Sequence, residues 1–299
     1  MKMPNLEQAY QFCQNMAQSH YENFPVASIL LAKKLRRPIS VIYAFARTAD
    51  DFADEGDAPQ QQRLEQLEDF SIALQAIKAS EYQGDNPIFI ALADVIIQHQ
   101  LPIKLFEDLL DAFKQDVVKN RYANFEEVLD YCTRSANPVG RLLLHLVGQT
   151  NDQQLKQSDA VCTALQLINF YQDIVQDYTE SNRIYIPQDE LAKAGLKDSD
   201  LINPDSQKIA PLIRSFYQRA QLIMTYGAEL GAHLSGRMGW EVRAMTLGGI
   251  TTLNKLMSQN DNELLNRPRL NKLTLLKILF ISCSKKRYLY HANKQLNII

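Results

Sequence analysis

The stretch that decides the fold is VIYAFARTADDFAD, which runs from Val41 to Asp54. Its apolar residues recur at steps of three and four and so share one face of a helix: Ile42, Phe45, Ala46, Ala49, Phe52 and Ala53. A second face collects polar residues at i, i+4, i+7 and i+11: Tyr43, Arg47, Asp50 and Asp54. The pattern predicts a helix that carries two carboxylates beneath an arginine, which by itself is also typical of a solvated helix face.

A second stretch, AVCTALQLINFYQDIVQDY from Ala160 to Tyr178, repeats this arrangement. A thin polar stripe follows i, i+3, i+7 and i+11 and consists of Gln166, Asn169, Asp173 and Asp177. Because the stripe is apolar on both flanks, we expect this helix to be buried and the stripe to point into the protein. Unpaired buried carboxylates cost several kcal/mol each, so a cation is expected beside them.

The predicted metal ligands are all oxygen donors: Asp50, Asp54, Asn169, Asp173 and Asp177. Such a set favours Mg²⁺, with Mn²⁺ as an alternative, over zinc or copper. Mg²⁺ sites of this kind usually complete their coordination with substrate phosphates, so a diphosphate substrate with an apolar remainder is expected. Metal-assisted loss of diphosphate leaves a carbocation, which is the chemistry of isoprenoid synthases.

The rest of the chain also shows helical periodicity, and runs rich in strand-forming residues are hard to find. The expected helices cover residues 5–19, 25–55, 60–80, 87–98, 103–119, 125–149, 153–179, 208–234, 239–258 and 270–281. No composition shift marks a linker. We therefore predict an all-α bundle that forms a single domain over residues 1–299.

Charge is distributed unevenly along the chain, whose net charge is −2. Residues 267–299 hold eight Lys and Arg and no Asp or Glu, which leaves the remainder acidic and makes nucleic acid a poor partner. Two interpretations of the segment LTLLKILFIS (273–282) stay open. It is either a basic, apolar helix that contacts an anionic membrane surface, or a closing core helix with solvated lysines.

The four cysteines, Cys13, Cys132, Cys162 and Cys283, share no short spacing typical of a zinc site or disulfide framework. The N-terminal stretch lacks a secretory signal pattern, and no run approaches eighteen apolar residues. A cytoplasmic location is expected, at the inner face of the membrane if the basic segment docks there.

Four blocks of sequence resemble the squalene/phytoene synthase family: ENFPVAS (22–28), YAFARTADDFADEGD (43–57), YCTRSANPVGRLLLHL (131–146) and NFYQD (169–173) with RIYIPQDEL (183–191). The resemblance runs from about His20 to Lys277. It implies an isoprenoid synthase bundle with a central apolar cavity. Within the family, the chain is most similar to the bacterial hopanoid branch that makes hydroxysqualene from presqualene diphosphate, without a nicotinamide cofactor.

The resemblance also implies roles for individual residues. Asp50 and Asp54 would bind Mg²⁺ on one wall, and Asn169, Asp173 and Asp177 on the other. Arg47 would contact the diphosphate, and Tyr131 would lie near the reacting carbons. Further substrate-binding positions line the same cavity or support it: Tyr43, Asp51, Ala136, Asn137, Gln166, Arg183 and Arg267. Asp51 is expected to support its neighbours, and Arg183 to lie in a flap or a plain loop.

Departures from the family pattern narrow the expected reaction. Tyr21, Glu22 and Asn23 replace a Ser-basic-Ser segment that grips a second diphosphate, and Gln172 replaces an arginine. These losses favour one diphosphate on an already joined C30 substrate.

Two other functions stay open: head-to-head synthesis of presqualene diphosphate, squalene or phytoene, and a non-catalytic assembly factor, although such factors tend to lose the aspartates that this chain keeps. Contact with downstream enzymes of a squalene pathway is a further expectation.

Asn137 stands where relatives have no side chain, directly before Pro138. It either holds the water that quenches the carbocation to an alcohol, or satisfies the backbone carbonyl that Pro138 leaves without a donor.

Overall fold

The computed structural model describes residues 5–19, 32–202 and 206–298. Across these residues the regular structure is helical, and β pairing is limited to an isolated bridge between Arg121 and Ile184. The all-α prediction is therefore confirmed. Two sequence features, His20 and the segment Tyr21–Asn23, lie outside the described residues. In the described part of the chain, none of the helices is long and apolar enough to cross a membrane.

The chain packs as two compact units. The first comprises Met1–Val118 and Pro138–Thr150, and the second comprises Lys119–Asn137 and Asn151–Ile299. The predicted metal ligands are therefore divided between the units. The single domain expected over residues 1–299 stays a prediction.

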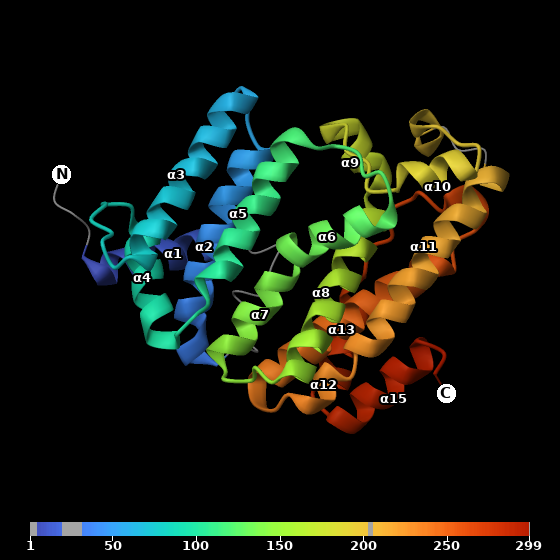
Figure 1. The fold of residues 1–299 in the computed structure, drawn as a ribbon. Coiled ribbons are helices and arrows are strands. Elements are labelled where there is room, and N and C mark those ends of the chain that lie inside the picture. The colour runs from blue at the N-terminus through green and yellow to red at the C-terminus, as the bar shows by residue number, and fades with distance from the viewer. Residues whose placement is uncertain (1–4, 20–31, 203–205, 299) are drawn as a thin grey trace. The chain divides into compact units, whose positions relative to one another are not determined.

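Figure 1 labels the helices of the first unit. They are α1 (Leu6–Ser19), α2 (Lys33–Asp54), α3 (Gln60–Lys78), α4 (Pro87–His99), α5 (Ile103–Val118) and α7 (Asn137–Leu146), which begins at the boundary. Phe45 of α2 is fully buried, and its ring lies 5.3–6.1 Å from those of Phe70, Phe89 and Phe106. The apolar face predicted for α2 therefore forms the core that joins α2 to α3, α4 and α5.

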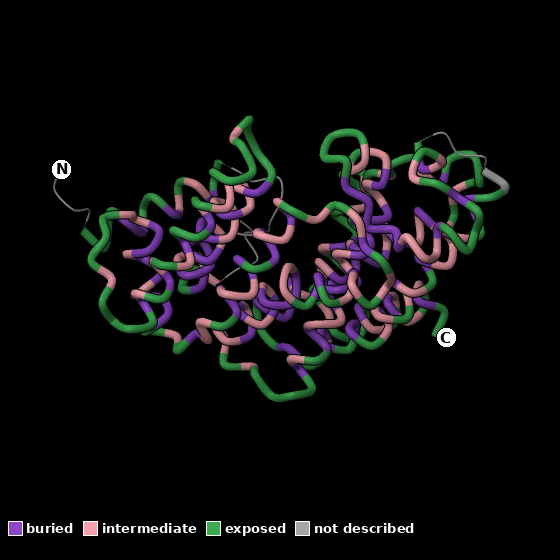
Figure 2. Tube along the Cα trace, turned by 45° about the horizontal axis from the view of Figure 1, so that its top comes forward, coloured by how far each residue is buried: buried purple, intermediate pink, exposed green. Residues whose placement is uncertain are grey.

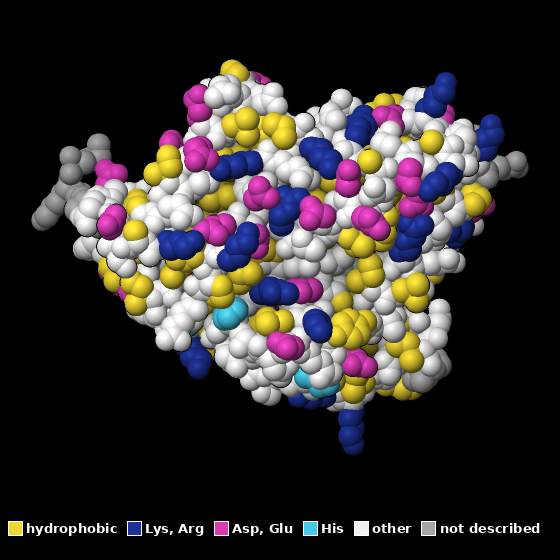
Figure 3. All heavy atoms as spheres, viewed as in Figure 1, with side chains coloured by type: hydrophobic (Ala, Val, Ile, Leu, Met, Phe, Trp, Pro, Cys, Tyr) yellow, Lys and Arg dark blue, Asp and Glu magenta, His cyan; other side chains and the backbone are white. Residues whose placement is uncertain are grey.

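The second unit is built around α8 (Asp152–Gln172), along which α11 (Ser206–Gly227) packs. Its other helices are α6 (Phe125–Ser135), α9 (Ile174–Ser181), α10 (Gln188–Lys193), α12 (Leu230–His233), α13 (Gly236–Met257), α14 (Lys272–Ser282) and α15 (Lys285–Gln295). Buried and exposed positions alternate along the helices (Figure 2), as amphipathic periodicity requires. Figure 3 shows acidic and basic side chains interspersed over the face that it displays.

Three predicted helices are interrupted. The helix expected over 125–149 breaks at Ala136 (φ −113°, ψ −48°), because Pro138 cannot donate the next backbone hydrogen bond. The helix expected over 153–179 breaks at Asp173 (φ −109°, ψ 15°), and the one over 208–234 breaks between α11 and α12. The helices α10 and α15 fall outside the expected ranges.

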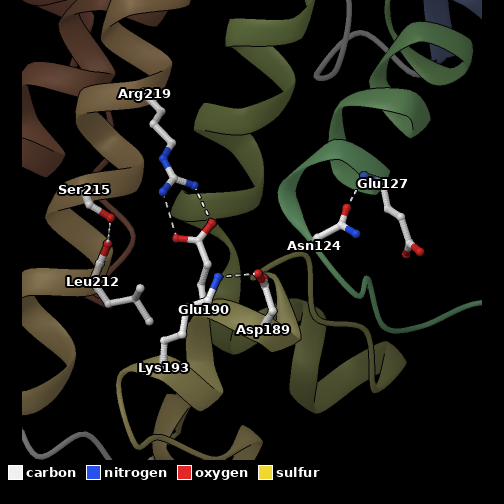
Figure 4. A network of polar contacts seen from close by, with 8 residues as sticks. All are labelled: Asn124, Glu127, Asp189, Glu190, Lys193, Leu212, Ser215 and Arg219. Carbon is white, nitrogen blue, oxygen red and sulfur yellow. Dashed lines mark hydrogen bonds and ion pairs between the residues drawn. The ribbon is translucent and has the colours of Figure 1, made fainter.

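Local chemistry fixes several helix ends. Asparagine side chains accept hydrogen bonds from backbone amides at the start of α4, α6, α8 and α14, which is the usual N-cap arrangement. Figure 4 shows one of them, Asn124, whose Oδ1 accepts from the amide of Glu127 at 3.0 Å. The same figure shows how α10 is held against α11 by a two-bond ion pair between Glu190 and Arg219.

At Gly227, the backbone of α11 lies close to that of α8. A Cβ atom at this position would lie 2.7 Å from the backbone nitrogen of Val161. We therefore expect Gly227→Ala to lower the free energy of unfolding by about 1–3 kcal/mol, because backbone must move to admit the methyl group. The measurement is urea unfolding followed by circular dichroism.

The matched control is Gly248→Ala on α13. A Cβ there would meet nothing within 4 Å, so the helix propensity of alanine should leave stability unchanged or raise it by up to about 1 kcal/mol. Equal stability of the two variants would contradict the close packing of α8 and α11.

Candidate functional site

The polar face of α2 gathers around Arg47. Its Nη2 lies 2.6 Å from Oδ1 of Asp51 and also contacts Glu55, while its Nη1 lies 3.7 Å from Oδ2 of Asp50. Glu55 was not among the predicted site residues, because it follows the helix and lies outside the i, i+4, i+7, i+11 stripe. The arginine therefore neutralises acidic side chains of its own segment, Asp51 among them.

Neighbouring charges and burial determine the protonation states of Arg47 and Tyr43 on this face. Burial alone would lower the pKa of Arg47, but the carboxylates of Asp51, Asp50 and Glu55 together outweigh this effect and raise it. Burial raises the pKa of Tyr43, so its hydroxyl stays protonated and can donate a hydrogen bond. Asp54 lies in the last turn of α2 and is exposed. The face thus combines oxygen donors for a cation with a guanidinium for an anion.

The second acidic face differs from the prediction. The helix ends at Gln172 and restarts at Ile174, so Asp173 lies at a break between α8 and α9. The stripe was expected to point into the protein, whereas in the structure Asn169 is exposed and Gln166, Asp173 and Asp177 are partly buried.

Asp173 lines a pocket of about 410 Å³ in the second unit. The pocket is formed by Gln172, Asp173, Val175, Gln176, Glu180, Leu265, Arg267 and Arg269. Nε of Arg267 lies 2.7 Å from Oδ1 of Asp173, and its Nη1 donates to Oε1 of Gln176 at 3.2 Å. Arg267 and Asp173 therefore lie together in this pocket.

Three polar residues of this pocket were missed by the sequence analysis: Gln176, Glu180 and Arg269. They lie outside the stripe or beyond the recognised motifs, and no spacing rule links residues 176 and 267. Gln172 replaces an arginine of the family pattern, and its amide donates to the backbone oxygen of Pro268 at 2.8 Å. It therefore holds the segment that carries Arg267.

Tyr131 belongs to a buried aromatic cluster with Tyr122, Phe170 and Tyr185. The rings of Phe170 and Tyr185 stack with centroids 3.5 Å apart. The contact places Tyr131 of α6 beside the apolar flank of α8. These rings offer π-faces that attract a cation.

The segment around Arg183 is anchored within the second unit. Arg183 and Tyr185 are both buried, and Nη1 of Arg183 donates to the Tyr185 hydroxyl at 3.4 Å. The amide of Ile184 donates to the backbone oxygen of Asn120 at 3.0 Å. These contacts order the segment, and its role as a flap or a plain loop stays a prediction.

Asn137 is buried at the start of α7, next to the buried Ala136. Its Oδ1 accepts a hydrogen bond from Oγ1 of Thr163 on α8 at 2.9 Å. The side chain oxygen therefore binds a neighbouring helix, a partner that neither sequence interpretation included.

Within the described ranges, no group of three or more His, Cys, Asp or Glu side chains is placed to hold a metal ion. The α2 ligands belong to the first unit and the α8–α9 ligands to the second. The convergence of the five predicted ligands on one cation stays a prediction.

Comparisons with known proteins agree with these observations. The sequence pattern of the squalene/phytoene synthase family matches residues 17–276. The hydroxysqualene synthase of Zymomonas mobilis is 43% identical over 60% of this chain, and the aligned part spans 59% of that protein's own length. The hydroxysqualene synthase of Rhodopseudomonas palustris is 35% identical over 74% of each chain.

Solved structures show the same fold. The squalene synthase HpnC of Alicyclobacillus acidocaldarius has a TM-score of 0.75 at 33% identity, covering 84% of this chain and 94% of its own. A dehydrosqualene synthase, at 17% identity, has a TM-score of 0.79 over 96% of this chain and 98% of its own. The latter similarity concerns the all-α isoprenoid synthase fold alone.

The pKa of the Asp173 carboxyl predicts how the stability of the folded chain depends on pH. Burial raises its pKa, Arg267 lowers it and Glu180 raises it, with a raised pKa as the result. A raised pKa stabilises the folded state below the unfolded value of about 3.9, and this contribution is lost as pH rises through the folded pKa. Asp173→Asn should therefore raise the urea midpoint of the metal-free protein at pH 7, and the two proteins should converge below about pH 4.

Arg267→Gln is the companion variant. It removes the attraction that favours the Asp173 carboxylate, so its urea midpoint at pH 7 should fall below that of the unaltered chain. A lower midpoint for Asp173→Asn at pH 7 would show that the ion pair outweighs the cost of burial.

Proposed function

This chain belongs to the squalene/phytoene synthase family and, as its similarity to hydroxysqualene synthases shows, is an enzyme of this class; we propose that it converts presqualene diphosphate to hydroxysqualene in a Mg²⁺-dependent reaction. One observation carries the proposal: each acidic face holds its own arginine, Arg47 beside Asp50 and Asp51, and Arg267 beside Asp173. Each face therefore offers oxygen donors for a divalent cation and a guanidinium for a diphosphate. A magnesium–diphosphate ligand carries both complementary charges.

The donor set fits a hard divalent cation. Asp50, Asp54, Asn169, Asp173 and Asp177 would hold it, with Mg²⁺ as the expected ion and Mn²⁺ as an alternative. Burial disfavours the Asp173 carboxylate, and a cation would relieve this cost more fully than the half-exposed Arg267 does. When bound, the metal supplies neutralisation of the negative charge that develops on the departing diphosphate.

The chain's own residues would position and protect the reaction. Arg47 and Arg267 bind diphosphate oxygens, and Tyr43 donates a hydrogen bond to the same head group. The carbon–oxygen bond breaks with its electron pair leaving on the diphosphate, and the cyclopropylcarbinyl cation rearranges. The ring of Tyr131, backed by Phe170, attracts this cation.

Water then supplies the oxygen of the product. It attacks the rearranged cation, and its proton passes to the released diphosphate, so that presqualene diphosphate and water give hydroxysqualene and diphosphate. The step consumes no reductant, and we propose that no nicotinamide cofactor takes part. Relatives named hydroxysqualene synthase, at 43% and 35% identity, support this choice.

A second candidate is head-to-head synthesis from farnesyl or geranylgeranyl diphosphate. Its support comes from a solved relative titled squalene synthase at 33% identity and from a Mycobacterium tuberculosis phytoene synthase at 28% identity. Against it stands Gln172, which holds Pro268 and brings no positive charge for a second diphosphate. Product analysis with each substrate separates the two reactions.

The test is incubation with presqualene diphosphate and Mg²⁺ in ¹⁸O-labelled water, with and without a reduced nicotinamide, followed by mass analysis of the lipid extract. We expect an alcohol that carries solvent oxygen, in an amount that the nicotinamide does not change. Formation of squalene that depends on the nicotinamide, or turnover only with farnesyl diphosphate, would contradict the proposal.

Removal of one carboxylate charge from either face should abolish turnover while leaving the fold intact. We expect Asp54→Asn and Asp173→Asn each to lower kcat on the order of a hundredfold or more, because each variant loses a carboxylate charge that would hold the metal ion beside the leaving diphosphate. The control is Asp69→Asn on the exposed surface of α3, which should keep full activity. Full activity of Asp54→Asn or Asp173→Asn would remove the metal model.

The role of Asn137 can be separated from its packing. Asn137→Gly should raise the proportion of hydrocarbon over alcohol if the amide holds the quenching water. Thr163→Val removes the donor to Asn137 and should lower stability by about 1–3 kcal/mol, because a buried acceptor loses its partner. An unchanged product ratio in Asn137→Gly, together with reduced stability in both variants, would assign Asn137 to packing alone.

We propose a cytoplasmic location for the enzyme, because its four cysteines have no spacing typical of a disulfide framework. Contact with downstream enzymes of a squalene pathway is proposed from family resemblance alone.

A further inference from the structure

The helix α14 is apolar on nearly every side, yet the protein covers only part of it. Ile278 and Ile281 are buried, and Trp240 of α13 donates from its indole nitrogen to the backbone oxygen of Leu279 at 3.2 Å. A helix that is apolar all round is normally buried all round. The remaining faces of α14 therefore need an explanation.

The uncovered side chains are large. Leu273, Leu276 and Phe280 recur at i, i+3 and i+7 and are 77%, 63% and 65% exposed, and Leu275 is exposed as well. Leu273, Leu276 and Phe280 share one side of the helix and form what we call the α14 face. Two interpretations of this segment were open from the sequence. A closing core helix would bury these residues, so the structure favours the interpretation in which the apolar face contacts something outside the chain.

The charge around the α14 face indicates the kind of partner. Residues 267–299 contain eight Lys and Arg and no Asp or Glu. Lys272 and Lys277 are exposed on α14, and three more basic residues, Lys285, Lys286 and Arg287, are exposed at the start of α15. The guanidinium of Arg287 lies 4.3 Å from the centre of the Phe280 ring, so positive charge borders the apolar face directly.

We propose that the α14 face docks on an anionic lipid bilayer. Leu273, Leu276 and Phe280 would enter the boundary between head groups and acyl chains, and the surrounding lysines would bind lipid phosphates with their aliphatic stems along the apolar surface. The helix has 11 residues, which is about 16 Å at 1.5 Å per residue, so it lies along the interface. The positive charge distinguishes this surface from an apolar patch that a second copy of the chain covers.

The chain carries its own reporter of this docking. Trp240 is its one tryptophan, and its indole nitrogen also donates to Oγ of Ser282 on α14 at 2.9 Å. Lipid contact at α14 should therefore shift Trp240 emission to shorter wavelength. Binding is measured independently by co-sedimentation of the full chain with vesicles.

The experiment compares vesicles of phosphatidylglycerol and phosphatidylcholine (3:7) with vesicles of phosphatidylcholine alone. We expect binding to the anionic vesicles, at least tenfold weaker binding to the neutral ones, and loss of binding as salt rises to 0.5 M. Leu276→Gln/Phe280→Gln should weaken binding at least tenfold, and Lys272→Gln/Lys277→Gln by about fivefold for each charge.

The matched control is Ile97→Gln, which removes an apolar side chain that is 72% exposed on α4 and should bind like the unaltered chain. Turnover of a substrate presented in detergent is measured for every variant, so that a failure of docking is told apart from a failure of the proposed chemistry.

Three results would overturn the proposal. The first is equal binding of Leu276→Gln/Phe280→Gln and the unaltered chain. The second is equal binding to neutral and anionic vesicles. The third is a dimer in sedimentation velocity that Leu276→Gln/Phe280→Gln dissociates, because a second copy would then cover the face.

Discussion

The account depends on one electrostatic constraint: two acidic segments carry negative charge that needs a positive partner, and at Asp173 burial disfavours that charge. In the chain without ligand, two arginines form ion pairs with carboxylates of these segments: Arg47 on α2 and Arg267 beside α9. These pairs are partly exposed, so each contributes little to stability by itself. Under the proposed function, these ion pairs separate when the ligand binds. The carboxylates then bind the cation and the guanidinium groups bind the diphosphate, so that every charge keeps a partner of opposite sign.

The packing of each unit serves to hold its acidic face in place. In the first unit, Phe45 anchors α2 against three neighbouring helices, and the polar face follows from the helix period. In the second unit, the close approach of α11 at Gly227 fixes α8, whose last turn leads into Asp173. The break at Asp173 turns the carboxylate toward Arg267 and the pocket that contains both.

Local patterns carried the predictions that succeeded. The all-α fold and the apolar face of α2 follow from apolar residues at regular steps. The break at Asp173 was missed because residues 174–181 continue the helical period and contain neither Gly nor Pro. The bonds from Gln172 to Pro268 and from Thr163 to Asn137 join residues far apart in sequence, so no spacing rule reveals them. The sequence also left the exposure of α14 undecided, because the composition of this helix suits either a protein core or a lipid surface.

The most direct test of the central claim is a crystal structure with Mn²⁺ and a non-hydrolysable thio-diphosphate analogue of the substrate. Anomalous scattering locates manganese without ambiguity. The account predicts manganese bound by oxygens from both α2 and the α8–α9 break, with Arg47 and Arg267 on the diphosphate. Manganese bound by one helix alone, or aspartates of the two helices facing away from each other into solvent, would contradict it.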